Sequence, residues 1–286
     1  MIRDGELSLA SPVVMGIVNV TPDSFSDGGD LMDPAVAVAA GVAMVRDGAA
    51  VVDVGGESTR PGSEPVSVDE ELARVLPVVS GLLDRGVVVS IDTKKAAVAS
   101  RCIAAGAHVV NDVSALSDPE MAAVCAEAGV GVIVMHMLGR PATMQQDPTY
   151  RDVVGEVTEF LDSRAERAIA AGVAPGAVAI DPGIGFGKTF EHNLELMSHL
   201  EAFTNGPYPV VLGTSRKGFL GTILERTRGA TAAKERDGAT AATVALGVAY
   251  GVSVLRVHNV RLGADVAATA NAMVPLEAHE QETNRT

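Results

Sequence analysis

Val13-Val14-Met15-Gly16-Ile17-Val18-Asn19-Val20 is an apolar run rich in β-branched residues, and polar residues follow it at once in Thr21-Pro22-Asp23-Ser24. Seven more runs of this kind follow at fairly even intervals, at residues 49–54, 87–91, 109–110, 130–135, 177–180, 210–212 and 252–257. Nearly all of them end abruptly in polar or charged residues. A strand buried on both faces of a parallel sheet forms a continuous hydrophobic run, so polar residues gathered at its C-terminal end need a separate explanation.

Helix-favouring, amphipathic stretches separate these runs, at residues 34–47, 68–85, 96–105, 119–128, 150–171, 190–201, 239–250 and 263–273. Strand and helix therefore alternate eight times, which predicts an α/β protein with a single (β/α)8 TIM barrel. In that fold the C-terminal ends of the strands form the mouth where the active site is built, which explains the polar residues. A doubly wound sheet is less favoured, because no Gly-x-Gly-x-x-Gly follows the first run.

The length of the chain and the residues between these segments indicate one domain. With 286 residues the chain matches a barrel of about 250 residues, so we expect residues 1–12 to be an N-terminal extension, 13–275 the barrel and 276–286 a polar tail. The dipeptides Asp33-Pro34 and Asp118-Pro119 predict N-caps followed by proline at the first helical position. The charged segment 225–237 is expected to be an exposed loop or a short extra helix.

Composition excludes several classes of partner. A net charge of −14 argues against a nucleic-acid partner, which needs a broad basic face. Residues 239–254 carry no charge, but polar residues and glycines interrupt them, so we expect no membrane span. The N-terminus lacks the basic start and apolar core of a signal peptide, which predicts a cytoplasmic protein. Cys102 and Cys125 are expected to be buried thiols.

The loops expected at the barrel mouth carry the candidate chemistry. Segments 19–29 and 55–62 are long and rich in turn formers, as in mobile lids, although ordinary surface loops are the alternative. The third, fourth and sixth runs end in Asp92, Asn111 and Asp181. Two carboxylates and a carboxamide that converge there suit a flat heterocycle with several N–H donors, whereas one aspartate alone is more often a helix cap or an ion-pair partner.

The last two runs indicate an anion site. They lead into Ser215-Arg216-Lys217 and Arg256-Val257-His258, and loops after the last two strands are the usual phosphate site of such barrels. Alternation along a strand places Arg256 and His258 on one face, although a purely structural role for His258 is the alternative. No zinc motif or serine nucleophile elbow is present, and Asn19 with anionic substrate oxygens would suit a weakly held Mg²⁺.

Seven of these segments, in this order, resemble the dihydropteroate synthase family, folate-pathway enzymes of the pterin-binding barrel group. The segments are residues 15–29 and 53–62, Ser90-Ile91-Asp92-Thr93, Asn111-Asp112, Asp181-Pro182-Gly183-Ile184-Gly185-Phe186, Ser215-Arg216-Lys217 and Arg256-Val257-His258. The resemblance implies a transferase that condenses 6-hydroxymethyl-7,8-dihydropterin diphosphate with 4-aminobenzoate to give 7,8-dihydropteroate and pyrophosphate. It also implies a homodimer formed through helices near the C-terminus, and sulfonamides as mimics of 4-aminobenzoate.

The resemblance also implies roles for particular residues. Lys217, Asp92, Asp181, Arg256 and His258 would be catalytic. The pterin would be bound by Asp92, Asn111, Asp181, Lys217, Phe186 and Met135. The diphosphate would be bound by Asn19, Thr59, Arg60, Arg256 and His258, with Asn19 also touching Mg²⁺. The aminobenzoate would be bordered by Phe25, Thr59, Pro61, Ser215 and Lys217.

The chemistry implied is an SN1-like displacement. Pyrophosphate leaves readily once Mg²⁺ and cationic side chains take up its charge, and the neutral aromatic amine needs positioning more than a strong base. Two alternatives remain open: a pterin-dependent methyltransferase-type barrel and a non-catalytic pterin-binding paralogue. One departure from the family is Asn259, where aspartate is usual, and the loss of that carboxylate is expected to alter how His258 is oriented. No role is assigned to His136.

Overall fold

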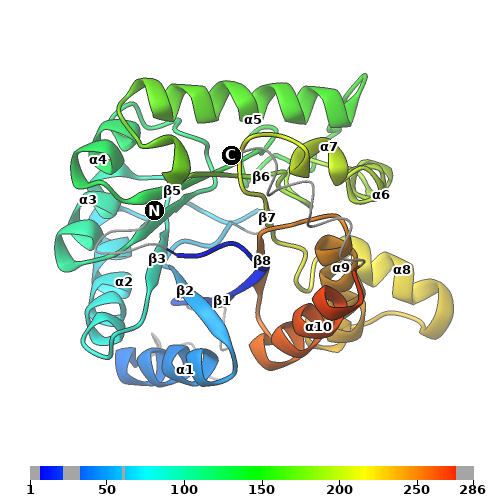
Figure 1. Cartoon of the computed structure of the whole chain (residues 1–286), viewed down its shortest axis with the longest axis horizontal. Coiled ribbons are helices and arrows are strands. Elements are labelled where there is room, and N and C mark those ends of the chain that lie inside the picture. Colours follow the sequence, from blue (N-terminus) through cyan, green and yellow to red (C-terminus); the bar gives the residue numbers. More distant parts are fainter. Residues whose placement is uncertain (1–6, 22–32, 60–61, 275–286) are drawn as a thin grey trace.

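The computed structural model describes residues 7–21, 33–59 and 62–274, and within them eight strands form one parallel sheet (Figure 1). The strands are β1 (Val13–Asn19), β2 (Ala49–Gly55), β3 (Val89–Asp92), β4 (Val109–Asp112), β5 (Gly131–Met135), β6 (Val178–Asp181), β7 (Val211–Leu212) and β8 (Val254–Val257). Their order in the sheet is β6-β5-β4-β3-β2-β1-β8-β7, and every neighbouring pair is parallel.

The two edge strands of this sheet meet and nearly close the barrel. Ile180 of β6 forms a parallel bridge with Val210, and its N–H donates to the Pro209 carbonyl at 3.0 Å. The predicted (β/α)8 barrel is therefore confirmed. Because closure removes the open edges of the sheet, the polar residues at all eight strand ends come to surround one opening.

Helices surround the strands, as Figure 1 shows. They are α1 (Pro34–Arg46), α2 (Val68–Leu83), α3 (Ala96–Ala105), α4 (Met121–Ala128), α5 (Val153–Ala170), α6 (Phe190–Ser198), α7 (Glu201–Thr204), α8 (Gly218–Arg228), α9 (Asp237–Ala249) and α10 (Val260–Met273), with 3₁₀ turns η2 (Pro175–Ala177) and η3 (Ala233–Arg236). Among the described residues no helix is both long and apolar enough to cross a membrane.

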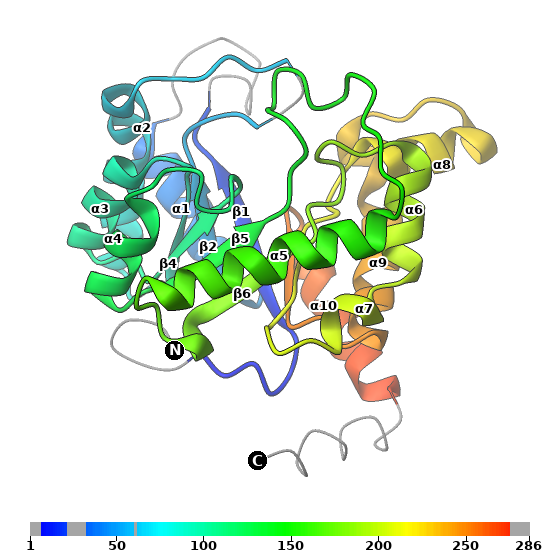
Figure 2. The same ribbon diagram turned by 90° about the horizontal axis from the view of Figure 1, so that it is seen from above.

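Segment 225–237 differs in part from its prediction as an exposed loop or a short extra helix. Its first residues complete α8, its last residue begins α9, and the 3₁₀ turn η3 lies between. Helix α8 was not predicted from the sequence. Its apolar face begins at Phe219 and Leu220, but the charged residues at its C-terminal end interrupt the helical pattern. Figure 2 shows α8 projecting beyond the other helices.

The alternation of side chains along the strands determines which residues enter the barrel. A small apolar cluster inside the barrel contains Met15, Val51, Val109, Ile133, Val211 and Val254. Two residues further along β2, β4, β5 and β8, on the same face of each strand, are Asp53, Asn111, Met135 and Arg256. The interior is therefore apolar near the start of the strands and polar toward the mouth. The larger apolar cluster fills the space between strands and helices.

The two predicted N-caps have different outcomes. Asp33 caps α1 as expected, because its Oδ1 accepts from the Ala35 N–H at 2.9 Å. The prediction for Asp118 is wrong, because α4 begins at Met121 and its N-cap is Glu120. Asp118 Oδ2 accepts instead from the Ala96 N–H at 2.9 Å, so this carboxylate caps the neighbouring helix α3.

The two cysteines lie in α3 and α4 and are free and buried, as predicted. Burial raises the pKa of both Cys102 and Cys125 to about 12. Each thiol is therefore neutral at physiological pH and packs as a small apolar group.

Candidate active site

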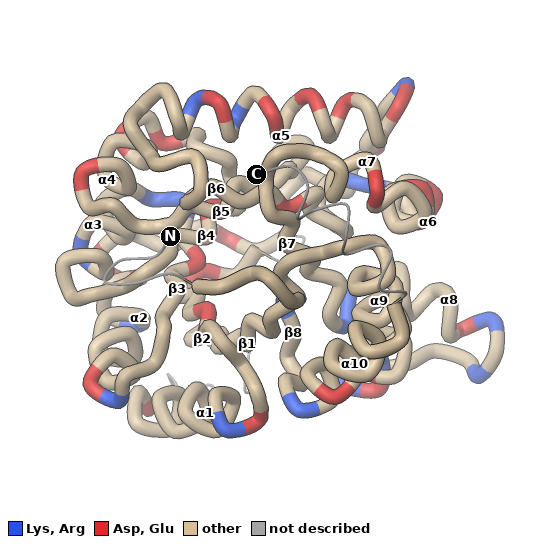
Figure 3. The backbone as a smooth tube through the Cα atoms, in the orientation of Figure 1, with Lys and Arg blue, Asp and Glu red and all other residues tan. Residues whose placement is uncertain are grey.

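Arg256 lies at the centre of the charged groups in the barrel mouth. Its Nε donates to Asp53 Oδ2 and its Nη2 to Asp92 Oδ2, both at 2.7 Å. Asn111 Nδ2 donates to the same Asp53 oxygen at 3.0 Å. The ends of β2, β3, β4 and β8 are thereby joined in one network, and Figure 3 shows acidic positions among the strands in the middle of the barrel.

Burial of this network changes the protonation of its members. Burial raises the pKa of Asp92 to about 7, against the attraction of Arg256 and with the repulsion of Asp53. Burial opposes the charge of Arg256, but Asp53 and Asp92 outweigh it and raise the pKa of the guanidinium. The arginine is therefore a permanent cation, while Asp92 can exchange its proton near neutral pH.

Asp53 is a residue of this network to which the sequence assigned no role. It is fully buried, and its Oδ1 has no hydrogen-bond partner. Its signal in the sequence was a carboxylate inside an apolar strand, two residues after Val51. A buried carboxylate needs a paired cation, and Arg256 of β8 is that cation for Asp53.

The loop after β6 forms a second wall of the mouth. Asp181 Oδ1 accepts from the Gly183 N–H at 2.7 Å, and burial raises the pKa of Asp181. Gly183 has a φ of +65°, and a Cβ there would lie 1.8 Å from the His136 carbonyl oxygen, so only glycine fits this turn. The Met135 Cγ lies 3.3 Å from the same Cβ position, so Met135 packs against the turn.

Lys217 faces this wall from the loop after β7. Its Nζ lies 3.6 Å from the centroid of the Phe186 ring, which is a cation–π contact. The side chain is half-buried, and burial together with the nearby Arg256 lowers the pKa of Lys217 to about 7, against the attraction of Asp181. A flat ring placed beside Phe186 would therefore meet an amine that holds its proton only loosely.

Ser215 and His258 form a pair at the ends of β7 and β8. Ser215 Oγ accepts from the His258 backbone N–H at 3.1 Å and lies 2.9 Å from His258 Nδ1. The serine hydroxyl can therefore donate to Nδ1, which leaves the histidine proton on Nε2. Burial, together with the repulsion of Arg216 and Arg256, lowers the pKa of His258 to about 3. His258 is thus a neutral hydrogen-bond donor rather than a cation.

Asn19 ends β1 and pairs in the sheet with Gly55 of β2. A Cβ on Gly55 would lie 3.5 Å from Asn19 Oδ1 and 3.6 Å from Asp92 Oδ2, so these two oxygens approach the same glycine. Thr59 lies in the loop after β2 and is partly buried. Phe25, Arg60 and Pro61, also predicted to bind substrate, lie outside the described residues.

The loop after β2 is anchored at its base. Glu57 forms ion pairs with Lys94 and Lys95, and Lys95 also pairs with Glu71 of α2. These contacts lower the pKa of Glu57, although burial alone would raise it. The Gly62 N–H donates to the Pro141 carbonyl at 3.2 Å, so this loop also touches the loop after β5.

His136 is buried and contacts Lys188. Lys188 Nζ lies 2.8 Å from His136 Nδ1 and donates to the carbonyls of Gly183 and Phe186, each at 3.0 Å. Burial lowers the pKa of Lys188 to about 7 and that of His136 to about 3. The two residues therefore hold the loop that carries Phe186, and no local pattern in the sequence predicts this pairing.

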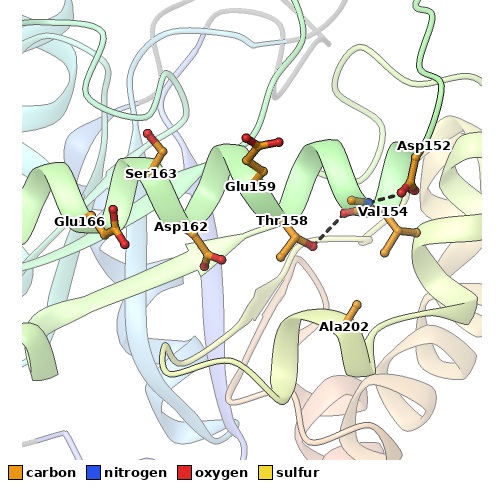
Figure 4. A pocket seen from close by; sticks show the side chains of 9 residues that line it. Asp152, Val154, Thr158, Glu159, Asp162, Ser163, Glu166 and Ala202 are labelled. Atoms are coloured by element: carbon orange, nitrogen blue, oxygen red, sulfur yellow. Dashed lines mark hydrogen bonds between the residues drawn. The ribbon is translucent and has the colours of Figure 1, made fainter.

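A groove of about 670 Å³ lies elsewhere, between α5 and α7 (Figure 4). It is lined by Asp152, Val154, Gly155, Thr158, Glu159, Asp162, Ser163, Glu166 and Ala202. All of them belong to α5 or α7 except Asp152, which is the N-cap of α5. The mouth, with its converging carboxylates and cations, is the better candidate for chemistry.

The described residues include no group of three or more His, Cys, Asp or Glu side chains arranged to hold a metal ion. The oxygens of Asn19 and Asp92 near Gly55 are hard ligands of the type that Mg²⁺ prefers. Because Mg²⁺ is usually held by one or two protein oxygens together with substrate phosphates, this donor set fits a substrate-bridged Mg²⁺.

Known proteins are similar to this chain in both sequence and architecture. The family model described as "Pterin binding enzyme" matches residues 15–258. The dihydropteroate synthase of Mycobacterium leprae is 46% identical over 269 residues, which cover 93% of this chain and 95% of that protein. The solved Yersinia pestis dihydropteroate synthase, with a sulfonamide drug complex, has a TM-score of 0.89 at 39% identity and covers 95% of this chain and 98% of its own.

A second solved structure is the Xanthomonas albilineans dihydropteroate synthase with 4-aminobenzoic acid. It has a TM-score of 0.86 at 41% identity and covers 94% of this chain and 96% of its own. The matched segment spans the strand ends from β1 to His258, which include the carboxylates, lysine and arginine of the mouth. The chain therefore belongs to the pterin binding enzyme family and, within it, to the dihydropteroate synthases, which are transferases of folate biosynthesis.

Proposed function

We propose that the chain condenses 6-hydroxymethyl-7,8-dihydropterin diphosphate with 4-aminobenzoate at the barrel mouth. The observation that carries the proposal is the convergence of Asp92, Asn111 and Asp181 with Lys217 beside the Phe186 ring. Such an arrangement offers acceptors for ring N–H groups along one edge and a flat apolar face. The 4-aminobenzoic acid bound to the Xanthomonas albilineans relative supports the choice of amine.

In this proposal the pterin lies between Phe186, Met135 and the carboxylates. Asp92 and Asp181 accept from N–H groups of the ring, and Asn111 both donates and accepts. Because burial raises the pKa of both aspartates, a ring that brings N–H donors favours their ionised forms. Two carboxylates beside the ring also stabilise positive charge that develops on the pterin.

The diphosphate lies toward the ends of β1, β7 and β8. Arg256 carries the permanent positive charge there, His258 donates from Nε2, and Asn19, Thr59 and Arg60 complete the set. When bound, Mg²⁺ would neutralise charge on the leaving pyrophosphate, with Asn19 as a protein ligand. Ser215, Lys217, Thr59, Phe25 and Pro61 border the amine.

The bond between the pterin methylene and the diphosphate breaks before the amine attacks, in an SN1-like order. The electron-rich reduced pterin delocalises the resulting charge, and Asp92 and Asp181 lie close enough to the ring site to stabilise it. The neutral aromatic amine then adds, and its proton leaves to solvent or to a neighbouring base. Positional isotope exchange within bound diphosphate, in the absence of 4-aminobenzoate, tests this order; absence of exchange alongside normal turnover would exclude it.

A pyrophosphate-release assay tests the function itself. Release should require both the pterin diphosphate and 4-aminobenzoate, and a sulfonamide should compete with the amine. Well-folded protein that binds pterin but releases no pyrophosphate would instead be a non-catalytic binding protein. Methyl transfer from a reduced pterin in place of condensation would indicate the methyltransferase-type alternative.

A homodimer formed through helices near the C-terminus, which the family resemblance implies, stays part of the proposal. Sedimentation equilibrium of the purified chain measures its mass directly. A mass of twice 29.3 kDa is the expected result, and a single-chain mass at micromolar concentration would contradict it.

A further inference from the structure

Asp237, the first residue of α9, connects the loops after β7 and β8. Its carboxylate accepts from Arg216 at both oxygens, from Nε to Oδ1 at 2.7 Å and from Nη2 to Oδ2 at 2.9 Å. Asn259 Nδ2 donates to the same Oδ2 at 3.0 Å. Arg216 lies between Ser215 and Lys217, and Asn259 follows His258 directly. One carboxylate therefore joins both segments that were predicted to bind an anion.

The backbone of Arg216 is held by the same region. Arg216 has a φ of +60°, a left-handed conformation that costs free energy for a residue with a Cβ. Its N–H donates to Thr240 Oγ1 at 3.1 Å, and its carbonyl accepts from Arg236 Nη1 at 3.1 Å. Side chain, N–H and carbonyl of Arg216 are thus all fixed by η3 and the start of α9.

This turn sets the directions of its two neighbours. The guanidinium of Arg216 is taken up by Asp237, so it pairs with α9 rather than lying beside Arg256 as part of an anion cluster. On either side of it, Ser215 contacts His258 and Lys217 contacts the Phe186 ring. Because Arg216 is left-handed, the side chains of Ser215 and Lys217 can both face the mouth while the Arg216 side chain points away from it.

The position of Asn259 fits the same bridge. Its Oδ1 accepts from the Leu262 N–H at 3.3 Å and caps α10, while its amide donates to Asp237. An ionised aspartate at 259 would have no hydrogen to donate to Asp237. The hydrogen bonds from Arg216 lower the pKa of Asp237, so it is an anion, and its charge acts on the nearby His258. The carboxylate expected near His258 is therefore supplied by α9.

We propose that Asp237 is a positioning residue that holds the Ser215–Lys217 turn and His258 in register, so that both loops close on one diphosphate. The inference rests on the proposed function of these loops. Asp237 and Arg216 are partly buried, at 21% and 23% exposure of their side chains, and the pairing is bidentate. Such a pair fixes geometry more firmly than a single surface contact.

Asp237→Asn tests the proposal, because it keeps the size of the side chain but removes its charge and one acceptor. The KM for the pterin diphosphate should rise about tenfold or more, as expected when supporting contacts shift binding groups by a fraction of an ångström. The KM for 4-aminobenzoate should change less. Calorimetric titration with inorganic pyrophosphate should show a similar loss, while affinity for the phosphate-free hydroxymethyl pterin changes little.

Glu235→Gln is the matched control. It makes the same change of charge two residues away. The Glu235 carboxylate accepts from the Ala232 N–H, and its backbone carbonyl, which the substitution leaves in place, accepts from Arg228 Nη2 of α8. This variant should bind pyrophosphate like the wild type. Asp237→Glu should restore part of the lost affinity, because the charge returns. Asn259→Ser keeps a good cap for α10 but loses the amide donor, so it should reproduce a smaller part of the loss.

A double-mutant cycle separates positioning from general destabilisation. Arg216→Gln and Asp237→Asn break the same pair, so their combined effect on pyrophosphate affinity should be smaller than the sum of the separate effects. The proposal fails if Asp237→Asn binds pyrophosphate like Glu235→Gln, or if it loses affinity for phosphate-free pterin equally. Pyrophosphate binding needs no turnover. If the wild-type protein had no synthase activity, the proposed function would be overturned, but the pyrophosphate affinities of the variants could still be compared.

Discussion

At the scale of single residues, Arg256 makes contacts that the sequence did not predict. The sequence placed it with the diphosphate because it shares a strand face with His258, but its Nε and Nη2 both donate to carboxylates of β2 and β3. One of these, Asp92, is a proposed pterin ligand. Under the proposed function Arg256 would therefore serve both halves of the substrate, as a charge for the diphosphate and as a support for the pterin acceptors.

Arg256→Ala should consequently weaken binding of the phosphate-free pterin as well as the pterin diphosphate. The reason is that Asp53, fully buried, and Asp92 lose their cation, and uncompensated buried carboxylates take up protons or rearrange. Calorimetry with both ligands measures this. Arg261→Ala, on the first turn of α10, serves as a control at an exposed arginine. Loss confined to the diphosphate would restore the simpler assignment.

The buried His136 should make stability depend on pH. Burial, with Lys188, lowers its pKa to about 3 in the folded protein. The unfolded chain, with a pKa of about 6.5, therefore binds a proton that the folded chain does not, and the free energy of unfolding falls as the pH falls below about 6.5. The slope for one such proton approaches about 1.4 kcal/mol per pH unit.

Urea unfolding at several pH values between 7 and 4 tests this, at roughly half-unit steps around the ordinary histidine pKa. His136→Asn keeps a hydrogen-bond acceptor for Lys188 and should flatten the slope by about one proton. His199→Asn removes an exposed histidine and is the matched control. Identical slopes for wild type and His136→Asn would show that this histidine is not held neutral.

At the scale of elements, the N-terminus of α3 and the loop after β6 both depend on a contact with a neighbouring βα unit. The first turn of α3 is capped by Asp118, which lies after β4. Lys188 holds the loop after β6 through two carbonyls of that loop and also contacts His136, which directly follows β5. The elements around the mouth are therefore held in place by their neighbours as well as by their own sequences.

Asp118→Ala should lower the free energy of unfolding by about 1 kcal/mol, the usual cost of losing a helix cap. The loss arises at the N-terminus of α3, where the Ala96 N–H would be left without its acceptor. Hydrogen exchange followed by mass spectrometry should show faster exchange at the start of α3 than at α4. Faster exchange confined to α4 would return Asp118 to the role that its sequence position suggested. Asp84→Ala, at the C-cap of α2, provides a control, because the Asp84 side chain does not cap a neighbouring helix.

At the scale of the whole molecule, the barrel brings two groups with pKa values of about 7 to one opening. Burial raises the pKa of Asp92 to about 7 and lowers that of Lys217 to about 7. These shifts come from enclosure by eight strand ends rather than from either local sequence. A closed ring of strands thus creates the electrostatic conditions that the proposed chemistry uses.

The pH profile of kcat/KM for the pterin diphosphate should therefore be bell-shaped, with its maximum near pH 7. The acid limb follows protonation of Asp92, which must be ionised to accept from the ring; the alkaline limb follows deprotonation of Lys217, which must be charged beside the anion. Lys217→Arg should remove the alkaline limb, because an arginine stays protonated. A profile that is flat from about pH 6 to 9 would contradict both assignments.

The fold could be predicted from the sequence, because periodicity and strand-end polarity are local features that repeat eight times. The sequence also determined which chemical groups reach the mouth, since alternation fixes the face of Asn111 and Asp181 once the strands are known.

The pairing of these groups follows from the closed barrel alone. Asp53 and Arg256 are 203 residues apart, and Arg216 meets Asp237 at the start of α9, just before the predicted helix 239–250. The partner of a buried charge depends on which strand ends meet when the barrel closes and on the burial that closure produces. No local pattern encodes that distance, so the network at the mouth, the caps between units and the Asp237 bridge became visible only in three dimensions.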